Sequence, residues 1–292
     1  MPHDAPASPA ADTDAGAPAF HSEVLSIEVD GHVATVWLDR PEKRNALGPA
    51  FWQDLPRAMA VVADDPAVRA VVVAARGPHF SVGLDLTAMG GLVSPGAGGS
   101  SSMASRAAAT RSEILRLQAS VTSVAACPKP VIAAVHGYCI GGGVDLIAAC
   151  DIRLAAADAV FSVRETKVAI VADLGSLQRL PGIIGRGHVA ELAFTGMDID
   201  AARAAEIGLV NHVVADEAAL AAAASELASR IAANSPLAVQ GTKAVLAIAD
   251  RQRVADGLDY VAAWNAGFFA SDDLTEAMVA FGEKRPARFS GT

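Results

Sequence analysis

The stretch Pro130-Val-Ile-Ala-Ala-Val135-His-Gly-Tyr-Cys-Ile-Gly-Gly-Gly143-Val-Asp145 combines a strand signal, a glycine-rich turn and a helix start. Residues 130–135 form a short, apolar, β-branched run of the kind found in buried strands. Residues 69–75 repeat this signal, and segments with helical spacing flank both runs. The alternation of strand and helix predicts an α/β or α+β fold built around a buried sheet.

Toward the N-terminus, the chain predicts a β-hairpin. Residues 24–29 and 32–38 alternate like strands and are joined through Asp30-Gly31, a common hairpin turn. Residues 48–63 then show helical spacing. Residues 1–20 are rich in Ala, Pro and Asp and contain no basic or apolar targeting segment, so we expect a disordered tail there.

Between the two strand signals, residues 90–102 are dense in Gly and Ser and predict a mobile loop, and 103–126 predict a helix ended by Cys127-Pro128.

Toward the C-terminus, helices dominate. A short strand is expected at 209–213, and further helices at 174–184, 186–195, 200–207, 217–233, 237–249, 254–270 and 274–281. We expect a tail over 1–20, a core over 21–200 and a helical region over 201–292.

Composition excludes several classes of protein. The 292 residues are 52% hydrophobic but 5% aromatic, and the net charge of −9 argues against a non-specific nucleic-acid binder. No apolar run approaches the roughly 18 residues of a membrane span. Three cysteines without CxxC spacing argue against disulfides or structural zinc and favour a reduced compartment, which we expect to be the cytoplasm.

Known cofactor and metal motifs are missing from the sequence. The glycine triplet does not fit the GxGxxG dinucleotide fingerprint, and there is no GxSxG nucleophile elbow and no HxxxH pattern. His136, in a turn of buried character, is interpreted as a structural residue. We therefore expect neither a metal ion nor a separate cofactor.

Three acidic residues, Asp145, Glu165 and Asp173, stand in apolar surroundings. Burial of an unpaired carboxylate is costly and shifts its pKa, which is also what a general acid or base near neutral pH requires. Each has a simpler interpretation: Asp145 as a helix-dipole partner, Glu165 in a surface ion pair, and Asp173 as a helix N-cap. The spacing of Asp145 from Gly142 and the apolar run before Asp173 favour proton chemistry.

Two turns after strands predict an oxyanion hole. Ser81-Val82-Gly83-Leu84-Asp85 follows one strand and Gly141-Gly142-Gly143 follows another. A backbone N–H from each turn, aimed at one point, would stabilise a developing oxyanion, and glycine permits close approach of a ligand. Glycine triplets also occur for packing alone, so that interpretation stays open for either turn taken by itself.

Six motifs in order resemble the crotonase, or enoyl-CoA hydratase/isomerase, family over about residues 24–290. They are Asp39-Arg-Pro-Glu-Lys-Arg-Asn-Ala-Leu47, Phe80-Ser-Val-Gly-Leu-Asp85, Lys129-Pro-Val-Ile-Ala-Ala-Val-His-Gly137, Gly141-Gly-Gly-Val-Asp145, Cys150-Asp-Ile-Arg153 and Leu177-Gln-Arg-Leu180. The resemblance implies a spiral of ββα units with a C-terminal helical trimerisation region, assembled as a homotrimer or a dimer of trimers.

The resemblance also implies an acyl-CoA thioester substrate. Its carbonyl oxygen would lie between the backbone N–H groups of Val82 and Gly142. The CoA part would contact Lys43, Arg44, Ala46, Gly83, Leu84, Asp85, Leu86 and Lys284.

The acids select a branch of the family. Hydratases of the family have Glu at the positions of Asp145 and Glu165 and Gly at that of Asp173. This chain resembles instead the Δ3,5-Δ2,4-dienoyl-CoA isomerase branch, which implies proton transfer from C2 to C6. Glu165 would be the base, Asp173 the acid and Asp145 a tuning group, with at least one raised pKa.

Two other functions remain open from the sequence. One is an enoyl-CoA hydratase or another crotonase-type enoyl-CoA isomerase, and the other is a non-catalytic acyl-CoA-binding protein. Acyl chain length, and the choice between trimer and hexamer, also remain open.

Overall fold

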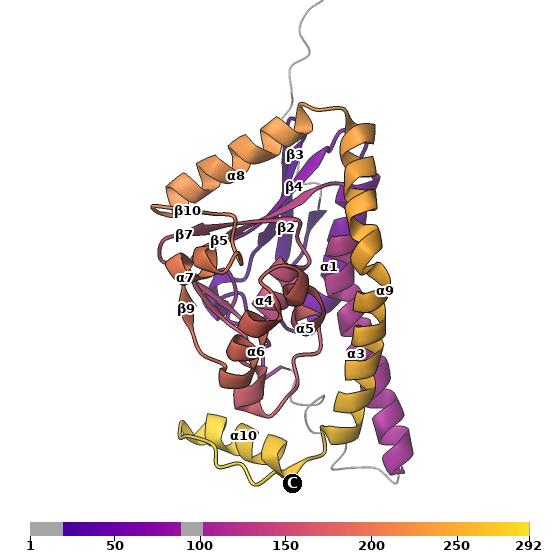
Figure 1. Cartoon of the computed structure of the whole chain (residues 1–292), viewed down its shortest axis with the longest axis vertical. Helices are drawn as coiled ribbons and strands as arrows, with labels where there is room; N and C mark the ends of the chain where they lie inside the picture. Colours follow the sequence, from indigo (N-terminus) through magenta and orange to yellow (C-terminus); the bar gives the residue numbers. More distant parts are fainter. Residues whose placement is uncertain (1–19, 89–101, 292) are drawn as a thin grey trace, which may run out of the picture.

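The computed structural model describes residues 20–88 and 102–291 (Figure 1). The tail predicted over 1–20 and the loop predicted over 90–102 lie outside these residues, except for their last positions. Phe20 does not belong to a tail, because it lies in strand β1 (Phe20–His21) and pairs with Ile27. Ser102 is the N-cap of helix α3 (Met103–Ala126), and its side chain accepts a hydrogen bond from the Ser105 backbone N–H.

The main sheet has seven strands in the order β1-β2-β3-β4-β5-β7-β10. Strands β1 to β3 are antiparallel, and β3 to β10 pair in parallel. The bounds after β1 are β2 Leu25–Asp30, β3 Val33–Leu38, β4 Ala70–Ala75, β5 Val131–Val135, β7 Ile152–Ala156 and β10 His212–Val214. A second, smaller sheet contains β6 (Tyr138–Ile140), β8 (Val160–Ser162) and β9 (Ile199–Asp200). The predicted hairpin is confirmed, but Asp30 pairs with Val33, so Gly31 and His32 form its turn.

Alternating side chains of the strands build a core on each face of the sheet. Val71 and Val73 of β4 pack into the larger core with Trp52 of α1 (Pro49–Asp64), whereas Val72 packs with Leu220 of α8 on the other face. Helix α8 (Glu217–Ala232) crosses that second face in Figure 1, and α9 (Pro236–Phe268) runs along α3. The remaining helices are α4 (Gly142–Ala148), α5 (Ser176–Arg179), α6 (Arg186–Thr195), α7 (Ala201–Glu206), α10 (Asp272–Glu283) and the 3-10 turns η1 (Pro41–Lys43), η2 (Glu165–Val168) and η3 (Leu180–Gly182).

Two predicted helices differ from the structure for local reasons. The helix expected at 174–184 is only α5 followed by η3, because Pro181 has no backbone N–H to donate to the carbonyl four residues earlier. The helices expected at 237–249 and 254–270 are one helix, α9. Residues 250–253, left between the two predicted helices, continue the helix, and Arg253 Nη2 donates to Asp250 Oδ1 at 2.7 Å across one turn.

Strand β10 lies beyond the predicted end of the core at residue 200. It pairs in parallel with β7 and completes one edge of the main sheet. The sheet therefore uses residues from the expected helical region, while the division of the chain at residue 200 stays a prediction.

Candidate active site

The two glycine-rich turns lie side by side after the parallel strands. Ser81 forms a parallel β-bridge with Cys139, and the Ile140 N–H donates to Ser81 O at 3.0 Å. A Cβ on Gly83 would stand 2.8 Å from Ile140 O and 3.7 Å from the Gly142 nitrogen. Only glycine at position 83 allows this approach, so its lack of a side chain brings the two predicted oxyanion donors together.

The two predicted donors differ in their present hydrogen bonds. The Val82 N–H donates to Arg44 O, which lies in the loop after η1, and the distance of 3.2 Å makes this a long hydrogen bond. Gly142 is the first residue of α4, where backbone N–H groups have no partner within the helix. A thioester oxygen that used both donors would have to share or replace the Arg44 carbonyl. The assignment of both donors stays a prediction.

The loop at 43–47 lies against residues 83–85. This contact brings most of the predicted CoA-binding residues together. The Leu47 N–H donates to Gly83 O at 2.8 Å, and the Asp85 N–H donates to Leu47 O at 3.0 Å. Asp85 also forms an ion pair with Arg40 at 3.1 Å, which makes it a structural support of the loop.

The other predicted CoA-binding residues lie around this junction or apart from it. Lys43 and Arg44 are exposed, whereas Ala46, Leu84 and Leu86 are half-buried and Gly83 is buried. Lys284 lies apart, as the left-handed C-cap of α10. In the described part of the chain it forms no hydrogen bond or ion pair with the other predicted CoA-binding residues.

Asp145 is 1% exposed and is held in place by α5. The Ser176 backbone N–H donates to Asp145 Oδ1 at 2.6 Å, so the carboxylate joins the first turn of α4 to the start of α5. Burial raises the pKa of Asp145 to about 6, and the Ser176 hydrogen bonds and the charge of Arg179 oppose this rise. Asp145 is therefore more than a helix-dipole partner, because it is a buried acid with a structural hydrogen bond.

Glu165 begins η2 and turns toward the oxyanion turn. A Cβ on Gly141 would stand 3.3 Å from Glu165 Oε1, and Glu165 Oε2 is buried without a hydrogen-bond partner. The surface ion pair that sequence allowed is not formed, because neighbouring Arg164 binds Asp198 at 2.6 Å instead. Burial raises the pKa of Glu165 to about 8, and the negative charge of Asp145 adds to the rise.

Asp173 lies in the segment between η2 and α5, and it is not an N-cap because Gly175 takes that position. The Asn265 side chain of α9 donates from Nδ2 to Asp173 Oδ2 at 2.7 Å. Burial raises the pKa of Asp173 to about 7, whereas this hydrogen bond opposes the rise and the charge of Asp145 adds to it. The structure thus brings the three acids together from α4, η2 and the segment before α5.

Sequence reasoning missed the polar residues that hold these acids. Arg179 is buried, donates to Leu174 O and Thr122 Oγ1 at 3.3 and 3.1 Å, and its charge acts on Asp145. Asn265 and Gln118 contact Asp173 from distant helices. A single Asn within the apolar residues 261–269 is the only sequence signal for Asn265, and it does not reveal the partner.

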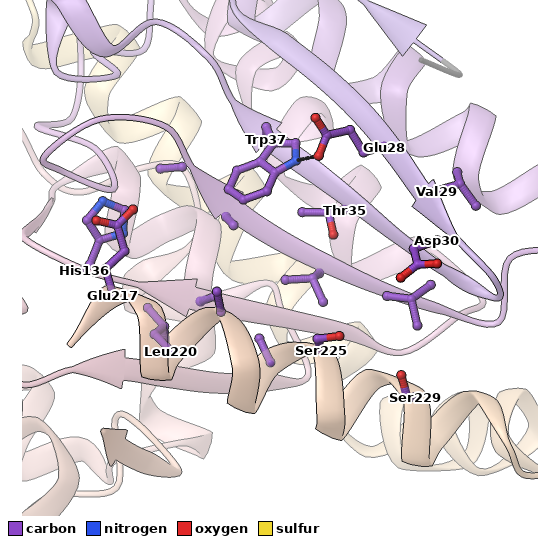
Figure 2. A pocket seen from close by; sticks show the side chains of 17 residues that line it. Glu28, Val29, Asp30, Thr35, Trp37, His136, Glu217, Leu220, Ser225 and Ser229 are labelled. Atoms are coloured by element: carbon purple, nitrogen blue, oxygen red, sulfur yellow. Dashed lines mark hydrogen bonds between the residues drawn. The ribbon is translucent and has the colours of Figure 1, made fainter. Parts of the chain in front are cut away.

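A cavity of about 290 Å³ lies elsewhere, between β2, β3 and α8 (Figure 2). Glu28 at its rim accepts a hydrogen bond from Trp37 Nε1 at 2.8 Å and another from Arg76 Nη2 at 2.6 Å. The cavity is on the α8 face of the sheet, whereas α4 packs into the core on the opposite face. None of the predicted catalytic residues lines it, so it is not part of the candidate active site.

Over residues 20–88 and 102–291, no helix is both long enough and apolar enough to cross a bilayer. Within the same ranges, no group of His, Cys, Asp and Glu side chains could hold a metal ion. His136, which the sequence predicted to be a structural residue, lies against the backbone, with its Nε2 2.7 Å from Gly77 O.

Residues 28–292 match the family model described as enoyl-CoA hydratase/isomerase. The chain therefore belongs to the enoyl-CoA hydratase/isomerase, or crotonase, family, as its motifs predicted. A crystal structure of an enoyl-CoA hydratase/isomerase from Mycobacterium paratuberculosis shares its fold with a TM-score of 0.78 at 30% identity, covering 88% of this chain and 98% of that one.

Two curated relatives bear more specific names. The chain is 41% identical to the peroxisomal Δ3,5-Δ2,4-dienoyl-CoA isomerase of Arabidopsis thaliana, over 92% of this chain and 96% of the relative. It is 44% identical to the mitochondrial Δ3,5-Δ2,4-dienoyl-CoA isomerase of Rattus norvegicus, over 88% of this chain and 78% of the relative.

Proposed function

We propose that this protein is a dienoyl-CoA isomerase that converts a 3,5-dienoyl-CoA into a 2,4-dienoyl-CoA. The observation that carries the proposal is a group of three carboxyls beside two joined turns, with Asp145 buried, Glu165 and Asp173 half-buried, and each pKa raised. The names of the two curated relatives support the same reaction. The CoA moiety is part of the substrate, and the residues provide proton transfer without a separate cofactor or metal.

In the proposed reaction, the thioester oxygen accepts hydrogen bonds from the Val82 and Gly142 N–H groups, which stabilise the dienolate. The Glu165 carboxylate removes a proton from C2, and the electrons of that C–H bond form C1=C2 of the dienolate, with negative charge on the thioester oxygen. When the dienolate collapses, C2=C3 forms, the C3=C4 electrons move to C4=C5, and the C5=C6 electrons take a proton from Asp173 at C6. Asp145 keeps its position through Ser176 and adds negative charge that disfavours full ionisation of the group.

The raised pKa values of the two carboxyls have a consequence for catalysis. The pKa of Glu165 is raised to about 8 and that of Asp173 to about 7, so the two groups titrate in the same range as a coupled pair. Attack at C2 requires the form in which Glu165 is ionised and Asp173 is protonated. We expect a bell-shaped dependence of kcat/KM on pH with its maximum between about pH 7 and 8.

The proposal is tested with 3,5-octadienoyl-CoA and the variant Asp173→Asn. We expect the variant to lose at least about a hundredfold in kcat, because the acid at C6 is gone. The measurement is the growth of 2,4-dienoyl absorbance, with solvent deuterium entering at C6 in the wild-type protein only. Full activity of a folded Asp173→Asn protein would remove Asp173 from the mechanism.

Hydration is the main alternative, and the identity of the first acid favours it less. Asp145 stands where hydratases of the family have Glu, and one of its two oxygens, Oδ1, already accepts the Ser176 N–H at 2.6 Å. Assays of crotonyl-CoA hydration beside dienoyl-CoA isomerisation separate the two reactions. A hydration rate far above the isomerisation rate would favour the hydratase, and binding of acyl-CoA without turnover would favour a non-catalytic binder.

We also infer a homotrimer, or a dimer of trimers, formed through the C-terminal helices. Exposed apolar side chains on α9 and α10 support it, and they include Leu237, Val245, Leu246, Ile248, Tyr260, Trp264, Phe268 and Phe281.

The two curated relatives are named as peroxisomal and mitochondrial, whereas the sequence favoured the cytoplasm. A cytoplasmic location of this chain stays a prediction.

A further inference from the structure

The segment that carries Asp173 is held by an amide side chain from the longest helix of the described chain. Asn265 of α9 is 2% exposed and donates both Nδ2 hydrogens, one to Val171 O at 2.8 Å and one to Asp173 Oδ2 at 2.7 Å. The same group therefore fixes the main chain before the acid and one oxygen of the acid itself.

A second amide holds the same segment without contacting the carboxylate. Gln118 of α3 is buried, and its Nε2 donates to Asp173 O at 2.8 Å and to Leu258 O of α9 at 2.9 Å. The two amides thus divide their roles, since Gln118 contacts only the backbone of Asp173 and Asn265 contacts its carboxylate. This difference supplies a matched control.

An amide nitrogen can only donate a hydrogen bond, so the oxygen that faces it must accept one. A proton on Asp173 Oδ2 would point at the Asn265 Nδ2 hydrogen, so Oδ1 is the oxygen that can carry a proton without opposing this amide. We propose that Asn265 is a positioning residue that keeps Oδ2 of Asp173 as an acceptor and makes Oδ1 the oxygen that carries the transferred proton. That this proton is the one delivered to C6 rests on the proposed isomerase function.

Asn265 also offsets part of the cost of ionising Asp173, beside a hydrogen bond from the backbone N–H of Asp173 itself. The charged groups that act on this carboxylate are Asp145 from α4 and Glu165 from η2, both negative, while Arg179 from α5 acts on Asp145. Within the described ranges, Asp173 forms no ion pair with Lys, Arg or His. The Asn265 hydrogen bond therefore keeps the pKa of Asp173 near the pH at which the enzyme must work.

The test compares Asn265→Leu with Gln118→Leu, since both remove the donors of one buried amide. The titration of Asp173 is followed by the infrared carbonyl band of its protonated carboxyl, isolated by subtracting the spectrum of Asp173→Asn. We expect the midpoint to rise by about one pH unit in Asn265→Leu and to stay in place in Gln118→Leu. An unchanged midpoint in Asn265→Leu, or equal shifts in both variants, would overturn the proposal.

Kinetics on 3,5-octadienoyl-CoA give a second readout. The acid limb of the kcat/KM profile reports the coupled titration of Glu165 and Asp173, so a rise in the pKa of Asp173 should move it to higher pH in Asn265→Leu and not in Gln118→Leu. A purely structural role would lower kcat in both variants without moving this limb.

A second variant and a substrate-free measurement distinguish a folding defect from a loss of function. Asn265→Ala removes the same donors without adding bulk, and it replaces Asn265→Leu if the larger side chain prevents folding. The infrared titration needs no substrate, so it decides the role of Asn265 even if the dienoyl-CoA assay refutes the proposed function. Conversely, isomerase activity with no shift in the titration refutes only the role of Asn265.

Discussion

At the scale of single residues, Glu165 shows how burial creates a reactive group. Its Oε2 is buried without a hydrogen-bond partner, and burial raises its pKa from 4.5 to about 8. Because the folded-state pKa lies above the unfolded-state value, the stability linked to the protonated acid is fully present below pH 4.5. It is lost as the pH rises through about 8.

The variant Glu165→Gln should therefore be more stable than the wild-type protein in alkaline solution only. We expect a gain of roughly 1–3 kcal/mol in the free energy of unfolding at pH 9 and little difference at pH 4.5, because the neutral amide avoids a buried charge. Urea unfolding at the two pH values measures it. Glu23→Gln, at an exposed position, is the control and should show no such pH dependence.

Asp145 and Asp173 could be singled out from sequence because each stands in an apolar stretch, whereas Glu165 lies between Arg164 and Lys167 and depended on the family's motifs. Their partners could not be predicted in the same way. Asn265 and Gln118 lie 92 and 55 positions away from Asp173, and only the packing of α9 and α3 brings them to it. The hydrogen bond from Val82 to Arg44 was also missed, since it depends on the path of a short loop.

At the scale of elements, Gly83 controls the distance between the two turns of the site. Its φ of +86° is in the left-handed region, and a Cβ there would lie 2.8 Å from Ile140 O. We expect Gly83→Ala to lower kcat/KM by about a hundredfold or more, because the added carbon forces the two oxyanion donors apart. Stopped-flow absorbance with the dienoyl-CoA substrate is the measurement.

Gly31→Ala is the matched control for that prediction. Gly31 also has a positive φ, +55°, but a Cβ there would meet nothing within 4 Å. The substitution should cost about 1–2 kcal/mol of stability through backbone strain alone and leave kcat/KM unchanged. Equal kinetic losses in both variants would show that strain, and not the separation of the turns, explains the effect.

The elements predicted from local signals were confirmed where those signals decide the structure. The predicted bounds of α3 and α6 agree with the structure, because a Ser N-cap, Cys127-Pro128 and flanking glycines mark their ends. Predictions were wrong where one residue, or a tertiary contact, overrides the pattern. Pro181 shortens α5, and the charged turn at 250–253 continues α9 where a break was expected.

At the scale of the whole molecule, helix α9 links the candidate active site to an uncovered apolar surface. Tyr260, Trp264 and Phe268 are spaced by four residues on one face of α9, and the Trp264 and Phe268 rings stack with centroids 4.7 Å apart. Large exposed apolar patches of this kind mark protein interfaces. Asn265, which holds the Asp173 carboxylate, is next to Trp264 on the same helix.

The proposed homotrimer should therefore depend on this aromatic face and should affect catalysis through α9. We expect the double substitution Trp264→Glu and Phe268→Glu to raise the dissociation constant of the proposed trimer by about 30-fold or more, because charges replace rings that such an interface would bury. Sedimentation velocity measures it.

Phe194→Glu is the control, since Phe194 is 82% exposed on α6, and it should leave the trimer intact. A wild-type protein that sediments as a monomer, or a double variant that stays trimeric, would assign the aromatic face to another partner. If the trimer does dissociate, the loss of support for α9 should appear in the acid limb of the pH profile as well as in the rate, because Asn265 moves with that helix.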